Sequence, residues 1–167
     1  HVLVIIQLNG GNDGLNMIIP IDQYDNLALA RPNIILPQNK IIKFSGYNTG
    51  IHPAMQGLAN LYDDGKLQVV QSVGYPQPNF SHFRATDIWL SASDSNQTVE
   101  TGWAGRYLSE EYPNFPIGYP NSVMPDPLAI QIGSFLSPAF QGPSVNMGMA
   151  ISDPVNFYNL INGIQSP

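Results

Sequence analysis

The chain has 167 residues, 43% of them hydrophobic, which is enough for one folded domain with a buried core. Its net charge is −6 and its six basic residues are scattered, so it lacks the basic stripe of a nucleic-acid-binding surface. Cysteine is absent, which excludes disulfide bonds and thiolate metal ligands, and no apolar run approaches the roughly 20 residues of a membrane span.

Three apolar runs bounded by turn residues predict strands. They are VLVIIQ at residues 2–7, LQVVQSV at 67–73 and LAIQI at 128–132. The first run is continuous and stops at the Gly10–Gly11 pair, which is typical of a buried strand that ends in a tight turn.

The segments between these runs predict helices. Apolar residues recur at helical spacing over residues 53–64, between Pro53, which suits the first turn, and Gly65, which suits the C-terminal cap. Further helices are expected in QYDNLALA, in SHFRATDIWLSAS after a Ser81 cap, in TGWAGRYLSEEY, and in VNFYNLIN after an Asp153 cap. In the SHFRATDIWLSAS helix, the expected apolar face consists of Phe83, Ile88, Trp89 and Leu90. In the TGWAGRYLSEEY helix, the side chains expected to face inward are those of Trp103, Tyr107 and Leu108.

The order of these elements predicts the fold class. Strands that alternate with helices favour right-handed crossovers and an α/β fold with a mainly parallel sheet. We expect a single domain over residues 1–167, with residues 111–127 as a loop or cap insertion.

The stretch NGGNDG places Asp13 directly after the first predicted strand. Strand ends of a parallel sheet lie at the edge where ligands bind. Asp13 is therefore either a local hydrogen-bond acceptor in a turn or a ligand of a hard divalent cation, which prefers carboxylate oxygen. A phosphate-binding loop is disfavoured, because the G-x-G-x-x-G and Walker spacings are absent.

The stretch PNFSHF follows the second predicted strand and starts a helix at Ser81. Ser81 is either a helix cap or a nucleophile, because free amide groups at a helix N-terminus stabilise an anion bonded to the hydroxyl oxygen. A metal ion is the expected activator, and Arg84 is a candidate clamp for an oxyanion. A Ser-His-Asp triad is disfavoured, because His82 is the adjacent residue and G-x-S-x-G is absent.

Two other polar residues have simpler interpretations. His52 is expected to cap or pack at the start of the 53–64 helix. Arg106 is expected either to pair with Glu110, four residues on, or to clamp an oxyanion.

The order and spacing of several stretches resemble the bacterial DUF1501 family, which belongs to the alkaline phosphatase and sulfatase superfamily. These stretches are QLNGGNDGLN, IHPAMQGLANLYDDGKLQVVQSVGYPQPNFSHFRATDIWLSAS, TGWAGRYL and LAIQIGSFLSPAFQG. The resemblance implies a doubly wound α/β fold, hydrolysis of phosphate or sulfate esters, and divalent zinc, calcium or magnesium ions. It also implies export to the periplasm, the cell surface or the medium.

By this resemblance Asp13 matches the first metal ligand of the superfamily, and Ser81 matches its nucleophile, with Thr86 as the alternative. His82 and Arg84 are then the expected contacts of a small anionic ester substrate. The family's further ligand motifs, Asp-x-x-His and Asp-His-Gly, do not occur in these 167 residues.

Two interpretations follow from the missing motifs. Either the chain is the N-terminal part of the family's domain, and its partner is the C-terminal remainder of the same protein, or it has lost the site. In both cases we expect this chain alone to be inactive. The alternative function is a non-catalytic secreted or cell-surface binding or assembly protein, supported by Tyr112, Phe115 and Tyr119 in a predicted loop.

Overall fold

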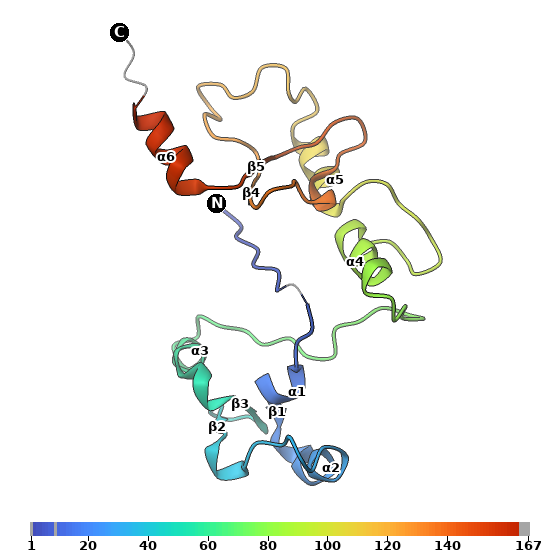
Figure 1. The fold of residues 1–167 in the computed structure, drawn as a ribbon, viewed down its shortest axis with the longest axis vertical. Coiled ribbons are helices and arrows are strands. Elements are labelled where there is room, and N and C mark those ends of the chain that lie inside the picture. Colours follow the sequence, from blue (N-terminus) through green and yellow to red (C-terminus); the bar gives the residue numbers. More distant parts are fainter. Residues whose placement is uncertain (1, 9, 164–167) are drawn as a thin grey trace. The chain divides into compact units, whose positions relative to one another are not determined.

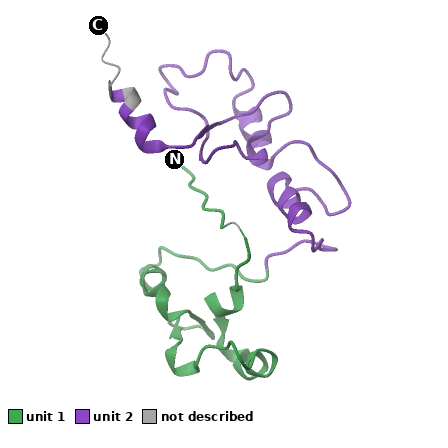
Figure 2. Ribbon diagram, in the orientation of Figure 1, with its two compact units in different colours: residues 1–72 green, residues 73–167 purple. Residues whose placement is uncertain are grey.

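A computed structural model of the protein describes residues 2–8 and 10–163. The chain divides into two compact units, His1–Ser72 and Val73–Pro167 (Figures 1 and 2). Each unit combines helices with a small sheet, which confirms the prediction of a mixed helix and sheet protein. Among the described helices, none has the length and apolar character needed to span a bilayer.

The first unit is built around a three-stranded antiparallel sheet with β3 in its centre, flanked by β1 and β2. Its elements are α1 (Gly14–Met17), β1 (Ile18–Pro20), α2 (Tyr24–Ala30), β2 (Ile42–Lys43), β3 (Thr49–Ile51) and α3 (Gln56–Asp63). Single 3₁₀ turns lie at Ile21–Gln23, Gln38–Lys40 and Pro53–Met55.

Alternation along these short strands gives the first unit two apolar clusters. Ile51 of β3 lies opposite Ile18 in register and packs with Phe44 and Ala59. The next residue of β1, Ile19, joins the other cluster. Successive side chains of a strand point to opposite faces, so three strands suffice to separate the two clusters.

The predicted helix over residues 53–64 is confirmed, as a 3₁₀ turn that continues into α3. Its C-terminus is closed by hydrogen bonds from Gly65 N to Tyr62 O (2.9 Å) and from Lys66 N to Leu61 O (2.8 Å). Gly65 has φ of +69°, the left-handed conformation that such a cap needs and that glycine adopts without strain.

The second unit contains three helices and a pair of parallel strands. They are α4 (His82–Ser91), α5 (Trp103–Glu111), β4 (Ile130–Ile132), β5 (Met149–Ile151) and α6 (Pro154–Gly163), with a 3₁₀ turn at Pro138–Phe140. The side chains of Ile88, Ala104, Ala139 and Met147 are buried. Helices α2, α4, α5 and α6 lie where the sequence predicts them, and Asp153 caps α6 by accepting from Val155 N and Asn156 N.

The predicted strands are only partly correct. Residues 130–132 form β4, but residues 2–7 and 67–73 form no strand, and β1, β2, β3 and β5 were not predicted. The described sheets are an antiparallel triplet and one parallel pair, so the prediction of a mainly parallel sheet is wrong for them. Strand propensity needs a neighbouring strand to accept the main-chain hydrogen bonds, and the two runs have none within the described sheets.

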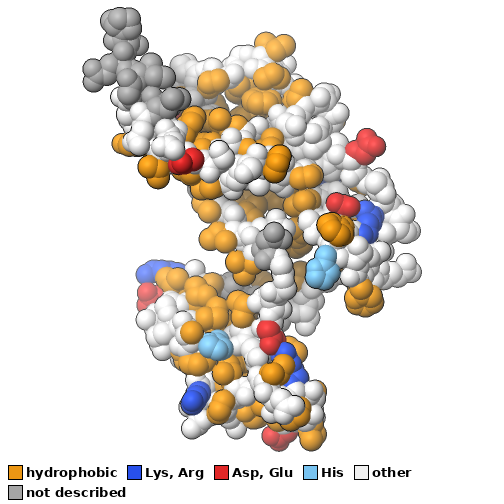
Figure 3. Space-filling model, viewed as in Figure 1, with side chains coloured by type: hydrophobic (Ala, Val, Ile, Leu, Met, Phe, Trp, Pro, Cys, Tyr) orange, Lys and Arg blue, Asp and Glu red, His pale blue; other side chains and the backbone are white. Residues whose placement is uncertain are grey.

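The first predicted strand instead lies exposed. The six apolar side chains between Val2 and Leu8 are 52–91% exposed, and Val70 and Val73 are also exposed. Hydrophobic atoms are visible over both units in Figure 3. The two unused strand runs therefore add to the exposed apolar surface.

The prediction that the aromatic side chains of α4 and α5 face the core is wrong for three of them. Phe83, Trp89 and Tyr107 are exposed, whereas Ile88 is buried. Helix α5 packs instead through its small residues, Ala104 and Gly105, which are buried. Close approach of main chains at small residues leaves the large side chains outside the contact.

Glu111, the first residue of the expected 111–127 segment, ends α5, and residues 112–129 contain no helix or strand. Within it the Tyr112 and Tyr119 rings meet edge to face at a centroid distance of 5.6 Å. Phe115 lies 6.2 Å from the Tyr119 ring centroid. These aromatic residues contact one another within the loop.

Candidate functional site

Asp13 stands at the start of α1, where its main-chain carbonyl accepts hydrogen bonds from Asn16 N and Met17 N, both at 3.1 Å. The chain reaches it through Gly10, whose φ of +92° suits glycine. The Asp13 side chain does not cap this short helix. It is therefore available for contacts outside α1.

The Asp13 carboxylate is held by the guanidinium of Arg31 in a two-pronged contact. Arg31 Nη1 lies 2.8 Å from Oδ1 and Nη2 lies 2.7 Å from Oδ2. The hydrogen bond from Arg31 is the largest cause that lowers the pKa of the Asp13 carboxyl below its usual 3.8, and it raises the pKa of Arg31 in turn. Both carboxylate oxygens are thus satisfied by a cation belonging to the chain.

Asn16 extends this contact to a third element. Its Nδ2 donates to Asp13 Oδ2 at 2.9 Å and to the main-chain carbonyl of Ile34 at 3.0 Å. The turn thereby gathers a carboxylate and a main-chain carbonyl, which present oxygen of the kind that Mg²⁺ and Ca²⁺ bind, and a side-chain amide that turns its nitrogen toward both. Each of these oxygen groups accepts hydrogen bonds from the chain's own nitrogen atoms.

The ion pair makes the stability of the first unit depend on acid pH. Because its folded-state pKa is lowered, the Asp13 carboxyl contributes stability above pH 3.8, and this is lost as pH falls through the lower folded value. We expect the urea midpoint of unfolding, measured by circular dichroism, to be lower at pH 2 than at pH 5. The decrease should be larger in the wild type than in Asp13→Asn. Equal falls in both proteins contradict a contribution from this pair.

Ser81 is confirmed as the cap of α4. Its hydroxyl accepts from Arg84 N at 3.5 Å, and its own main-chain N–H donates to Asn79 Oδ1 at 2.8 Å. Asn79 N in turn donates to the Tyr75 hydroxyl at 3.1 Å. Ser81 is exposed, so its hydroxyl lies at an accessible helix N-terminus.

The two predicted substrate contacts differ in their surroundings. His82 is exposed as the first residue of α4. The guanidinium of Arg84 donates to the main-chain carbonyls of Ser95 (3.3 Å) and Gln97. Arg84 therefore ties α4 to the turn that follows it, and clamping an anion requires it to leave these carbonyls.

The prediction that His52 caps the start of the 53–64 helix is confirmed, and the prediction that Arg106 pairs with Glu110 is wrong. His52 Nδ1 accepts from Ala54 N at 3.1 Å, which caps the turn before α3. Arg106 donates to Thr101 O and to Ser91 O, each at 2.8 Å, rather than to Glu110. Ser91 is the last residue of α4, so this hydrogen bond ties α5 to the end of α4.

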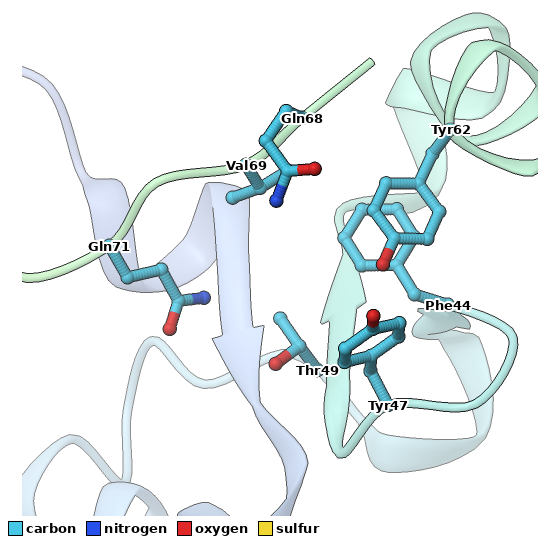
Figure 4. A pocket seen from close by; sticks show the side chains of 7 residues that line it. All are labelled: Phe44, Tyr47, Thr49, Tyr62, Gln68, Val69 and Gln71. Carbon is cyan, nitrogen blue, oxygen red and sulfur yellow. The ribbon is translucent and has the colours of Figure 1, made fainter. Parts of the chain in front are cut away.

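A hollow of about 190 Å³ in the first unit was not anticipated from the sequence. The Phe44 and Tyr62 rings stack at a centroid distance of 4.1 Å on one side, and Figure 4 shows the Tyr47 and Tyr62 phenol oxygens pointing toward one another. Burial, more than the neighbouring Tyr47, raises the pKa of the Tyr62 phenol. No lining side chain is charged at neutral pH, so the hollow offers aromatic and amide contacts but no acid–base group.

The structure thus gathers Asp13, Asn16 and Arg31 in the first unit, and Ser81 with Arg84 in the second. Sequence reasoning missed the Asp13–Arg31 pair, because 18 residues separate its members and no periodic pattern links them. Across residues 2–8 and 10–163, no three Asp, Glu or His side chains are grouped so that they could hold a metal ion.

Comparison with known proteins adds no relative. No model of a protein family, no curated protein and no solved structure matches this chain.

Proposed function

We propose that the chain is the N-terminal part of an exported, metal-dependent hydrolase of phosphate or sulfate esters with an alkaline phosphatase-like fold. The observation that carries the proposal is the exposed Ser81 hydroxyl at the N-terminus of the ten-residue helix α4. The motif resemblance to the DUF1501 family supplies the reaction class and the export. Asp13, whose carboxylate is held by Arg31, is the chain's candidate ligand for the cation.

The chemistry assigns each residue a task. The Ser81 oxygen would attack phosphorus or sulfur and displace the alcohol of the ester, whose oxygen takes up the proton that the serine loses. Water would then hydrolyse the serine ester and release phosphate or sulfate. The amides of the first turn of α4, including Arg84 N, which donates to the Ser81 oxygen, would stabilise negative charge on the group bonded to that oxygen. A bound divalent cation supplies positive charge that lowers the pKa of a hydroxyl. His82, adjacent and exposed, and Arg84 are the proposed substrate contacts.

The exposed strand runs support the proposal that further polypeptide of the same protein completes the fold. The six apolar side chains among residues 2–8 are 52–91% exposed. Pairing with further strands would bury them and satisfy their main-chain groups.

Metal removal tests the proposed function directly. EDTA is expected to abolish hydrolysis of aryl phosphates or aryl sulfates by the complete protein, because the serine hydroxyl then loses its activator. Re-addition of zinc, calcium or magnesium should restore it, while dialysis without EDTA is the control. Full activity in protein shown to be metal-free by elemental analysis contradicts the metal-dependent mechanism.

A second candidate function is non-catalytic binding or assembly at the cell surface. It is favoured by the aromatic cluster of Tyr112, Phe115 and Tyr119 in the 112–129 loop. Such aromatic residues are enriched in protein interfaces. Metal analysis of the complete protein separates the two functions, because stoichiometric metal favours the hydrolase and metal-free protein favours assembly.

A further inference from the structure

The hollow in the first unit is separate from the two polar turns described above. Its lining comes from the turn between β2 and β3, from β3, from α3 and from the segment after α3, all within residues 1–72 (Figure 4). The described lining carries no charge at neutral pH, and it includes Phe44, Tyr47, Thr49, Tyr62, Gln68 and Gln71. The hollow thus joins aromatic rings to uncharged polar groups, in a volume of about 190 Å³.

The polar side chains of the lining share one property, which is that each can both donate and accept hydrogen bonds. The amides of Gln68 and Gln71 donate through nitrogen and accept through oxygen, and the hydroxyls of Thr49, Tyr47 and Tyr62 do both through one atom. Burial raises the pKa of the Tyr62 phenol, so this hydroxyl keeps its proton at neutral pH. The lining therefore matches ligand groups that also donate and accept, as alcohol hydroxyls do.

The aromatic rings give the hollow its apolar side. The Tyr62 ring stacks on Phe44 at a centroid distance of 4.1 Å, and Tyr47 stands edge-on to Tyr62 at 6.0 Å and 85°. Phe44 is 4% exposed and anchors the stack in the core, whereas Tyr47 is 67% exposed and open to a ligand. The faces of such rings carry partial negative charge, which attracts the C–H groups of an apolar ligand face.

We propose that the hollow binds one neutral pyranose ring, with its C–H face against the tyrosine rings and its hydroxyls toward Gln68, Gln71 and Thr49. A sugar ring combines an apolar face with a rim of hydroxyls, and the volume of the hollow is of the order of one such ring. This site is distinct from the proposed ester hydrolysis and does not depend on it.

The lining disfavours two other kinds of ligand. An ionic ligand would lose its hydration without meeting an opposite charge among the described lining residues. A proline-rich peptide also packs on aromatic rings, but its proline residues offer carbonyl acceptors and no N–H donors. The acceptor oxygens of Gln68 and Gln71 would then have no partner on the peptide. A neutral sugar uses both the donors and the acceptors of the lining.

NMR titration of the full chain with the methyl glycosides of β-D-glucose, α-D-mannose and β-D-galactose tests the proposal. At least one of them is expected to bind with a dissociation constant in the millimolar range, because a single sugar has few atoms with which to gain affinity. The side-chain amide signals of Gln68 and Gln71 should shift along one saturation curve. The proposal is overturned if none of the glycosides shifts these signals at concentrations well above that range.

Tyr47→Ala and Gln71→Ala test the two sides of the hollow separately, and both side chains are exposed, so the fold does not depend on them. Tyr47→Ala should weaken binding about tenfold, and Gln71→Ala about fivefold. Tyr107→Ala is the matched control, because it removes a tyrosine of similar exposure, 61%, from the second unit. Affinity in Tyr47→Ala equal to that in Tyr107→Ala contradicts the proposed site.

Two further ligands identify the partner. Oligoproline is expected to leave the Gln68 and Gln71 signals unchanged, and a shift with oligoproline but with none of the glycosides would make the hollow a peptide groove and overturn the proposal. Cellotriose separates a free sugar from a glycan, since only a glycan gains affinity from its additional rings. All of these measurements report binding, so ester hydrolysis, which is tested by activity, can fail without affecting the sugar site.

Discussion

Ser81→Ala is expected to abolish ester hydrolysis by the complete protein, with a loss on the order of 10³-fold or more in kcat. The reason is that the hydroxyl forms the covalent bond to phosphorus or sulfur, and alanine has no atom that can replace it. A coupled assay of phosphate or sulfate release measures the effect. Full activity in Ser81→Ala removes this residue from the mechanism.

The structure provides controls for the second role of Ser81, which is to cap α4. Losing a serine cap costs about 1 kcal/mol of stability, whereas glycine at a cap costs only a few tenths. Ser81→Gly should therefore be as inactive as Ser81→Ala but more stable. Ser137 caps the 3₁₀ turn at Pro138–Phe140 in the same way, so Ser137→Ala should lose comparable stability and keep activity.

Gly105→Ala is expected to destabilise the second unit by about 3 kcal/mol, at the upper end for overpacking. A Cβ atom at Gly105 would lie 2.3 Å from the carbonyl carbon and oxygen of Gln141. These are main-chain atoms, so α5 must move away from the 138–141 segment, whose Gln141 carbonyl accepts from Gly102 N at 2.8 Å. The close approach that buries α5 would be lost.

Tryptophan fluorescence in a urea titration measures this effect, because both tryptophans, Trp89 and Trp103, belong to the second unit. Gly74→Ala is the matched control, since a Cβ at Gly74 would meet nothing within 4 Å. An unchanged urea midpoint in Gly105→Ala would mean that α5 does not pack as closely as described.

Helices and their ends were the features best predicted from the sequence. The Gly65 cap of α3, the Ser81 cap of α4 and the Asp153 cap of α6 all lie where the sequence places them. Each depends on a side chain or a glycine interacting with main chain only a few residues away. Such interactions can be read from neighbouring residues.

Strands were predicted less well, and the candidate site shows the same limit. Residues 2–7 have the composition of a buried strand but lie exposed. Strand β3 pairs with β1 and β2, although the composition of these three short segments did not predict strands. The position of Asp13 after a glycine turn could be predicted, but its pairing with Arg31 could not. Both depend on partners far away in the sequence.

The sequence by itself therefore determined the helices, their caps and the two polar turns that hold Asp13 and Ser81, because these follow from contacts within one or two helical turns. Only the tertiary structure decided which strands pair, which aromatic side chains are buried and that Arg31 holds Asp13. Long-range pairing is selected by the free energy of burying apolar surface and satisfying main-chain groups together, and no local pattern encodes which distant partner does so.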